Sequence, residues 1–285
     1  MDRSRIRKTL RLGLALTFAM LLCSCSRIKL VYGYGDWLLE RQAHKLLKLN
    51  SAPDDQLTAD IKAYWAWHRK EMLPAYAALC RKLSKGFRGE EKEEDNVAAA
   101  TPLINKLWQD TVDPVVRPVA VAMLSLDDKG LKYLEEAFAE SNRKERKLYL
   151  EDPEAAKKRR IKRTLGYVRD FAGSLSDEQE KKIGELTLAL KVPDEAWILD
   201  RERRQKEILG LLREKKGLDQ VEASLRRWWV GSRTKAEGDP ATIKESDLEA
   251  FFLGVLRALT PAQRLNAAKV MDAYALDFEE LAQGR

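Results

Sequence analysis

Apolar side chains recur every three or four positions along most of this chain, which is typical of amphipathic α-helices. The clearest stripe comprises Ile61, Tyr64, Trp65, His68, Met72, Tyr76, Leu79 and Leu83. No stretch alternates polar and apolar positions for long enough to predict a β-strand. We therefore predict an all-α fold in which residues 36–285 form one elongated multi-helix bundle, preceded by a lipoprotein signal peptide.

Prolines and charged loops predict where the helices are interrupted. Pro74 falls inside the stripe just described, where a kink or local break is expected because proline lacks an N–H. We expect a further break at Thr101-Pro102 and a separate short helix beginning at Asp113-Pro114. Gly231–Pro240 is the clearest predicted loop, and we interpret the short segment Arg27–Gly35 as a linker.

Two similar helix starts lie 84 residues apart, at Leu175-Ser-Asp-Glu-Gln179 and Leu259-Thr-Pro-Ala-Gln263. Each places a hydroxyl three residues before a glutamine, which is the pattern of a capping box. A weaker copy at Leu124–Asp128 lies 51 residues before the first, so the unequal spacing argues against a solenoid. The strings resemble the leucine-threonine-x-x-glutamine motifs of periplasmic chaperones of the Spy and CpxP type, but capping chemistry alone also explains them.

The first residues have the pattern of an export signal. Five basic residues within Met1–Arg11 precede Leu12–Leu22, which carries no charge. As a helix this apolar segment would span about 17 Å, too short for a hydrocarbon core of about 30 Å, but it fits a signal peptide. The following Leu22-Cys-Ser-Cys25 resembles the bacterial lipobox. We therefore predict a signal peptide over residues 1–24 and lipidation of Cys25; an ordinary signal peptide or an uncleaved anchor is the alternative.

Lipidation would fix where the protein works. Several acyl chains on one residue bind a bilayer stably, because each buried methylene contributes about 0.8 kcal/mol. Ser26 follows the cysteine, and the absence of Asp at that position favours the periplasmic face of the outer membrane. Residues 25–35 would then be the lipidated N-terminus and a tether.

The charge of the mature chain is smaller than that of the whole sequence. Removal of residues 1–24 leaves 47 basic and 44 acidic residues of the 52 and 45 in the full chain. A near-neutral exported domain gives no support for nucleic-acid binding. The segment Ser141–Asp170, however, contains eleven basic residues and only five acidic ones. This tract predicts contact with anionic lipid, polymer or an acidic partner, or simply a solvated helix surface; its candidate residues are Lys157, Lys158, Arg159, Arg160, Lys162 and Arg163.

No catalytic constellation is visible. His68 and Glu71 share one helix face, but a di-metal bundle needs several more such ligands, and His44 and Cys80 have no zinc-like spacing. We therefore interpret His68 as a partly buried, hydrogen-bonded structural residue and Cys80 as a small core residue. The pairs Trp65/Trp67 and Trp228/Trp229 are expected to fill space between helices, and no metal or cofactor is expected.

Several segments together resemble an uncharacterised family of proteobacterial lipoproteins of unknown function. The resemblance rests on Tyr32-Gly-Tyr-Gly-Asp-Trp-Leu-Leu39, Trp67–Tyr76, Asn142, the Leu175–Gln179 cap, and Trp197 followed by Arg201 and Gln205. It departs at Asn50–Gln56, where the family tends to have a threonine-proline cap and Ala52 precedes Pro53 here. The resemblance implies an anchored, all-helical envelope protein and no reaction.

We accordingly expect a lipoprotein that binds a protein or envelope polymer without catalysis. Two alternatives remain open at this point. A chaperone-like binder of unfolded periplasmic proteins would need a concave surface that is partly apolar and basic. An enzyme would need carboxylates or histidines from distant helices in one pocket.

Overall fold

The chain is helical throughout the part that the computed structural model describes, which is residues 26–49, 51–231 and 239–284. Within these residues there is no strand, so the all-α prediction is confirmed. The predicted signal peptide, the lipidation site Cys25 and residues 232–238 of the predicted loop lie outside the described residues. No helix in the described ranges is both long and apolar enough to cross a membrane.

The elements follow one another with short connections. In chain order they are α2 (Ser26–Gly33), α3 (Gly35–Leu46), α4 (Ser51–Trp67), the π-helical turn η1 (His68–Met72), α5 (Leu73–Phe87), α6 (Glu93–Leu124), α7 (Asp128–Tyr149), α8 (Pro153–Ala172), α9 (Asp177–Ala189), α10 (Asp194–Arg213), α11 (Leu218–Trp229), α12 (Glu245–Ala258) and α13 (Pro261–Ala282).

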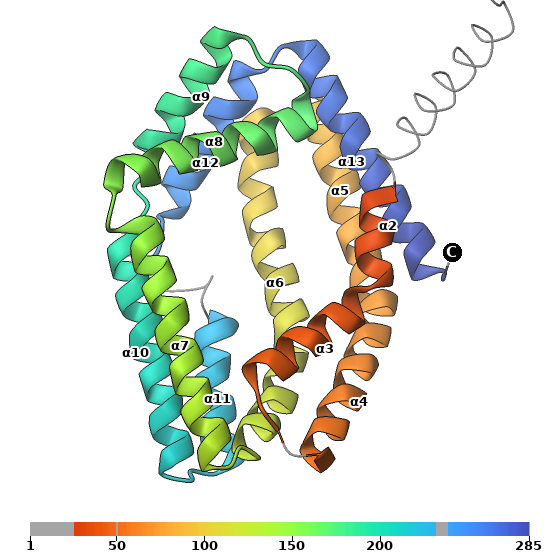
Figure 1. Ribbon diagram of the computed structural model, residues 1–285. Helices are drawn as coiled ribbons and strands as arrows, with labels where there is room; N and C mark the ends of the chain where they lie inside the picture. Colours follow the sequence, from red (N-terminus) through yellow and green to blue (C-terminus); the bar gives the residue numbers. More distant parts are fainter. Residues whose placement is uncertain (1–25, 50, 232–238, 285) are drawn as a thin grey trace, which may run out of the picture.

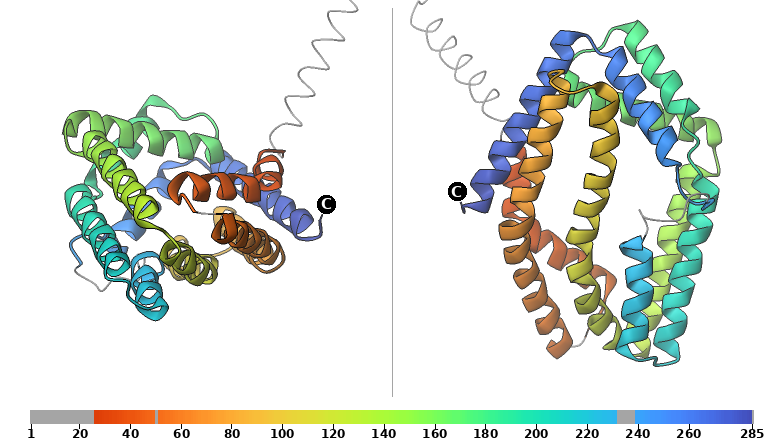
Figure 2. Two further views of the ribbon diagram at one scale, coloured as in Figure 1. Left: turned by 60° about the horizontal axis from the view of Figure 1, so that its bottom comes forward. Right: turned by 180° about the vertical axis from the view of Figure 1, so that it is seen from behind.

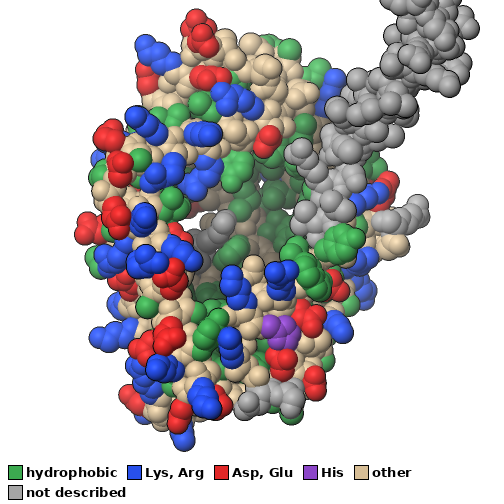
Figure 3. All heavy atoms as spheres, viewed as in Figure 1, with side chains coloured by type: hydrophobic (Ala, Val, Ile, Leu, Met, Phe, Trp, Pro, Cys, Tyr) green, Lys and Arg blue, Asp and Glu red, His purple; other side chains and the backbone are tan. Residues whose placement is uncertain are grey.

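These helices form a closed frame instead of packing around one central axis (Figure 1). One column contains α4, α5, α6 and α13, and the other contains α7, α10 and α11 (Figure 2). Helices α8, α9 and α12 join the columns at one end, and α3 crosses between them near the other. The space-filling view shows a hollow between the columns with hydrophobic side chains around it (Figure 3).

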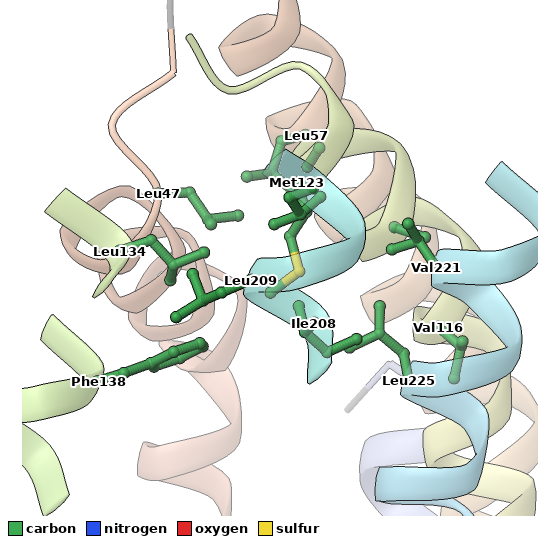
Figure 4. Packing of buried hydrophobic residues seen from close by; sticks show 13 residues of the cluster. Leu47, Leu57, Val116, Met123, Leu134, Phe138, Ile208, Leu209, Val221 and Leu225 are labelled. Carbon is green, nitrogen blue, oxygen red and sulfur yellow. The ribbon is translucent and has the colours of Figure 1, made fainter. Parts of the chain in front are cut away.

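The largest hydrophobic core lies at the end of the frame where α6 meets the second column. Helices α6, α7, α10 and α11 supply most of its side chains (Figure 4). Leu134 and Phe138 of α7 lie beside Leu209 of α10, while Ile208 lies against Leu225 of α11. Burying a side chain of this size stabilises the fold by about 1.5–3 kcal/mol. This core therefore holds the two columns together at one end.

A second core runs between α5 and α13, which joins the C-terminal helix to the early part of the chain. Ala77 and Cys80 of α5 pack against Met271 and Ala275 of α13. Cys80 is buried, which confirms its prediction as a core residue, and burial raises the pKa of its thiol to about 11. The thiol is therefore protonated at neutral pH.

The predicted breaks at Thr101-Pro102 and Asp113-Pro114 are wrong, because α6 is one helix of 32 residues. Pro102, Pro114 and Pro118 all lie inside it. Each proline removes one backbone hydrogen bond and strains the preceding turn. Val116 and Ala120 of the same helix have no exposed surface. The packing of α6 against α4, α5 and α11 thus offsets the local cost of the prolines, from which the sequence pattern alone predicts breaks in the helix.

The two similar helix starts are capping boxes, as predicted, and they also bind each other. Ser176 caps α9 through the N–H of Gln179, and Thr260 caps α13 through the N–H of Gln263. The two glutamine amides pair reciprocally, with nitrogen–oxygen distances of 2.7 and 3.0 Å. Each amide also donates to a carbonyl two residues before the other helix's cap, Gln179 to Ala258 and Gln263 to Ser174.

This symmetric contact locks the α8–α9 hairpin to the α12–α13 hairpin. We predict that Gln179→Ala and Gln263→Ala each lower the free energy of unfolding by about 1–2 kcal/mol, because each leaves partly buried groups unpaired. The double variant should lose less than the sum of the two, since both side chains belong to one network. Urea unfolding measures these values, with Gln220→Ala, an exposed glutamine in the first turn of α11, as the control. Strict additivity would contradict a direct contact.

Candidate functional site

The six candidate residues of the predicted basic tract all lie in α8, on different sides of the helix. Asp152 caps this helix through the N–H of Ala155, and Pro153 occupies its first turn. Two of the six candidate residues are used within the fold: Lys157 pairs with Glu154 at 2.8 Å, and the partly buried Arg160 pairs with Asp194 of α10. The exposed Arg159 donates to the carbonyl of Leu148. The structure therefore does not present all six cations in the same way.

The remaining three cations of the tract face solvent. Lys158, Lys162 and Arg163 are exposed and make no ion pair with any residue that the structure describes. Lys158 and Lys162 are separated by one helical turn and so lie on the same side of α8. Basic side chains also gather over α8 in the space-filling view (Figure 3). This face can attract an anionic surface at close range.

A polar network joins α7 to α10 beside the start of α8. Asn142 donates to Gln205 Oε1 at 2.6 Å, and Arg201 donates through Nε to Asn142 Oδ1 at 3.1 Å. One turn along, Arg146 makes a bidentate contact with Glu202 at 2.6–2.7 Å, which holds the pKa of that carboxyl below its usual value. Asn142, Arg201 and Gln205, three of the residues that carried the family resemblance, therefore meet in one place.

The network lies under an open depression on the molecular surface. The depression is lined by Ala139, Asn142, Arg143, Arg146, Glu151 and Glu202. Gln205, which is hydrogen-bonded to Asn142, is 2% exposed, and its Nε2 has no hydrogen-bond partner among the described residues. An unpaired buried donor costs about 1–3 kcal/mol. A buried bridging water would satisfy this donor.

An exposed aromatic side chain lies next to this depression. Trp197 of α10 is 41% exposed and contacts the ring of Tyr149 edge-on. The guanidinium of Arg201 lies 5.9 Å from the centre of its ring. Trp197, Arg201 and Gln205 follow one another at intervals of four residues, so they share one side of α10. This spacing was visible in the sequence and indicated that the three residues share a helix face, but it did not show that this face packs on α7.

Two other residues of the family resemblance, Tyr32 and Tyr76, meet at His68, the first residue of η1. Its Nδ1 lies 2.9 Å from the Tyr32 hydroxyl of α2, and its Nε2 lies 3.2 Å from the Tyr76 hydroxyl of α5. The Tyr76 hydroxyl in turn lies 2.5 Å from Thr111 Oγ1 of α6, which donates to the Leu107 carbonyl. His68 is buried, so its prediction as a hydrogen-bonded structural residue is confirmed.

The direction of these bonds can be deduced from Thr111. Because its only hydroxyl proton goes to Leu107, Tyr76 must donate to Thr111 and accept from His68 Nε2–H. His68 Nδ1 is then the acceptor for Tyr32. Burial lowers the pKa of His68 and raises that of Tyr64, a neighbour in this cluster, to about 12. The cluster is therefore neutral near pH 7.

The same cluster fixes the segment predicted to be a linker. Arg27–Gly35 lies mostly in α2, and Tyr32 is 7% exposed with its ring stacked on Trp65 at 4.5 Å. A Cβ on Gly35 would lie 2.1 Å from the Trp65 ring, so only glycine fits there. We call Tyr32, Gly35, Trp65, His68 and Tyr76 the N-terminal clamp. Residues 26–35 thus pack on the domain. The aromatic ring of Tyr32 is more stable in contact with Trp65 and His68 than exposed to water.

The remaining chemical expectations concern the tryptophans and metal ligands. Trp65, Trp67, Trp228 and Trp229 are each half-buried, and the last two pack against the main core, as predicted. Within the described ranges there is no group of three or more His, Cys, Asp or Glu side chains placed to hold a metal ion. His44 instead contacts Asp54 at 2.6 Å.

The fold and these contacts define an all-α domain whose N-terminal helix is fixed to its body. Residues 45–227, more than half of the chain, match a family of unknown function, DUF6279, and the chain belongs to this family. The resemblance to an uncharacterised family is thereby confirmed. No curated protein and no solved structure matched the chain.

The N-terminal clamp predicts a specific dependence of stability on pH. Since burial lowers the pKa of His68 in the folded state, the unfolded chain takes up a proton first, near pH 6.5. The His68 contribution is complete above that pH and decreases below it by at most about 1.4 kcal/mol per pH unit.

Urea unfolding from about pH 8 to pH 5 tests this dependence. His68→Gln should be less stable than the wild type at pH 8, because it breaks the contacts with Tyr32 and Tyr76. The difference between the two proteins should then shrink as the pH falls. A constant difference across the range would show that His68 does not titrate with unfolding.

Proposed function

We propose that this protein is a lipoprotein anchored through Cys25 at the periplasmic face of the outer membrane. Its helical domain would bind a protein or polymer of the cell envelope without catalysing a reaction. The anchor is supported by the basic and apolar segments before Leu22-Cys-Ser-Cys25. The observation that carries the binding role is the unneutralised basic face of α8 beside the depression between α7 and α10.

The partner that fits this surface is anionic. Lys158, Lys162 and Arg163 supply positive charge that no described residue neutralises. Arg143 and Arg146 line the depression but already pair with Glu140 and Glu202, so the positive charge available to a partner comes from α8. Arg is suited to carboxylate or phosphate groups because its donors are arranged as a planar fork. Exposed Trp197 adds a flat apolar surface of the kind found at binding sites.

A chaperone-like role is the second candidate. It is favoured by the hollow between the two columns, where hydrophobic side chains gather on a concave face (Figure 3). Basic side chains lie around the same opening. This combination meets the requirement for binding unfolded chains, which expose apolar segments. Such a protein would bind many unrelated clients instead of one partner.

Crosslinking in intact cells, followed by mass spectrometry, tests the binding role. We predict that binding to one envelope component, measured by its crosslinks, falls about a hundredfold in the triple variant Lys158→Gln, Lys162→Gln, Arg163→Gln, since each basic residue at an anionic surface contributes about 1 kcal/mol. The matched control replaces three exposed lysines of other helices, Lys181, Lys182 and Lys206, by glutamine and should keep the crosslinks.

The outcomes separate the candidate functions. Equal crosslinking in both triple variants would contradict the role of α8, and no envelope partner above background would contradict the binding role. Many unrelated clients would favour the chaperone-like role. In the same preparation the N-terminal peptide should begin at Cys25 and carry acyl chains. An unmodified Cys25, or an intact 1–24 segment, would contradict the anchor.

A further inference from the structure

Helix α3 exposes a group of large apolar side chains that the fold does not use. Tyr34, Trp37 and Leu38 are 60%, 52% and 41% exposed. All three lie at the start of the helix, directly after α2. Most large apolar side chains of small helices are buried against a neighbour. An exposed cluster at one helix end therefore indicates an apolar surface outside the domain.

The outward side of α3 continues from apolar to basic along its length. Tyr34, Leu38, Arg41 and Lys45 occur at intervals of three or four residues and are all exposed, so they form one stripe. The guanidinium of Arg41 also lies 5.4 Å from the ring centre of Trp37. Neither Arg41 nor Lys45 makes an ion pair with a described residue.

The acidic side chains of α3 are turned towards the domain. Glu40 is half-buried and accepts a hydrogen bond from the Thr58 hydroxyl of α4 at 3.2 Å. Asp36 is also half-buried and accepts from the N–H of Trp37 at 2.8 Å. The exposed stripe consequently carries aromatic, aliphatic and basic groups without an acidic one. That combination is typical of helices that lie at a bilayer surface with anionic headgroups.

The N-terminal clamp keeps this stripe close to the predicted lipid. The described chain begins at Ser26, and the eight residues of α2 span about 12 Å as a helix. Tyr32 holds α2 through His68 and Trp65, and Lys29 pairs with Glu280 of α13. There is thus no flexible segment between residue 26 and α3 that would let the domain move away from its anchor.

The same face of the molecule carries α2, α3 and α8. In the view of Figure 1 all three helices lie in front, and Figure 3 shows hydrophobic side chains at the α2–α3 junction on that side. Basic side chains gather over α3 and α8 on it. A flat anionic surface placed against this face would meet apolar groups near the anchor and positive charge further away.

We propose that α3 docks on the bilayer that holds the lipid anchor. Tyr34, Trp37 and Leu38 enter the interface, while Arg41 and Lys45 contact phosphate groups of anionic lipids. The proposal rests on the anchored location proposed above, and it adds that the domain is held against the membrane in one orientation. The clamp favours lipid over a protein partner, because it keeps the stripe within a few helical turns of the acyl chains.

Fluorescence quenching tests this docking directly. The full chain, prepared from membranes, is reconstituted in vesicles of phosphatidylethanolamine and phosphatidylglycerol with brominated acyl chains, which quench tryptophans that enter the bilayer. We expect Trp37→Phe to remove most of the quenching. The matched control is Trp197→Phe, which removes an exposed tryptophan of α10 and should leave the quenching unchanged.

A second measurement separates the lipid from the helix. In the full chain with Cys25→Ala, which carries no acyl chain, we expect binding to the same vesicles to weaken roughly thirtyfold after Arg41→Gln and Lys45→Gln together. The matched control is Lys181→Gln with Lys182→Gln, which should bind as before.

The results distinguish the docking from the anchor. An acylated chain that floats with vesicles while Trp37 is unquenched would overturn the docking and leave the anchor. Equal vesicle binding by the two double variants would also overturn it. A wild-type chain prepared from membranes that proves to carry no acyl groups, but whose Trp37 is quenched, would support the docking and overturn the anchor.

Discussion

The hydrogen bonds of His68 are the constraint on which the arrangement of this domain depends. Both ring nitrogens are used, one by Tyr32 of α2 and one by Tyr76 of α5, and Thr111 extends the chain of bonds to α6. Leaving either nitrogen unpaired in this buried position would cost about 1–3 kcal/mol. Three helices from different parts of the chain are therefore held in one relative position.

The π-helical turn at His68 belongs to the same arrangement. Pro74 has no N–H to donate to the carbonyl of Lys70, so the turn before it can widen at little further cost. The wider turn changes the register between Trp65 in α4 and Tyr76 in α5. Both side chains then reach His68, while α4 and α5 continue as one column of the frame (Figure 1). The break expected at Pro74 is thus a short change of helix type.

The sequence predicts the local chemistry of the domain well. The capping boxes at Ser176 and Thr260, the buried Cys80 and the hydrogen-bonded His68 all follow from residue type and spacing. Such features involve neighbours within one or two turns, whose separation along the chain is known.

Features that depend on distant partners could not be predicted in this way. Gln179 and Gln263 are 84 residues apart, and Asn142 and Gln205 are 63 apart, so nothing local shows that either pair meets. The prolines of α6 mislead for the same reason, because the packing that offsets their cost comes from other helices. For the candidate site, the sequence indicated the basic tract but could not separate Arg160, which pairs with Asp194, from Lys158, which pairs with no residue that the structure describes.

These contacts connect the fold to the proposed location. The C-terminal helix α13 returns along α5 and contacts α2 through Lys29 and Glu280, so the two ends of the described chain brace the same corner of the frame (Figure 1). A lipid attached just before α2 would then hold a rigid domain, with α3 towards the membrane. The depression between α7 and α10 would keep a defined position relative to the bilayer.

Amide hydrogen exchange of residues 30–33, whose N–H groups are bonded within α2, tests in the full chain the central claim, that the N-terminal helix is clamped to the domain. The clamp predicts that these amides exchange slowly, to a degree comparable with those of α5, and that Tyr32→Phe or Gly35→Ala accelerates them. Exchange in the wild type as fast as in an unstructured peptide would contradict the clamp and restore a flexible tether.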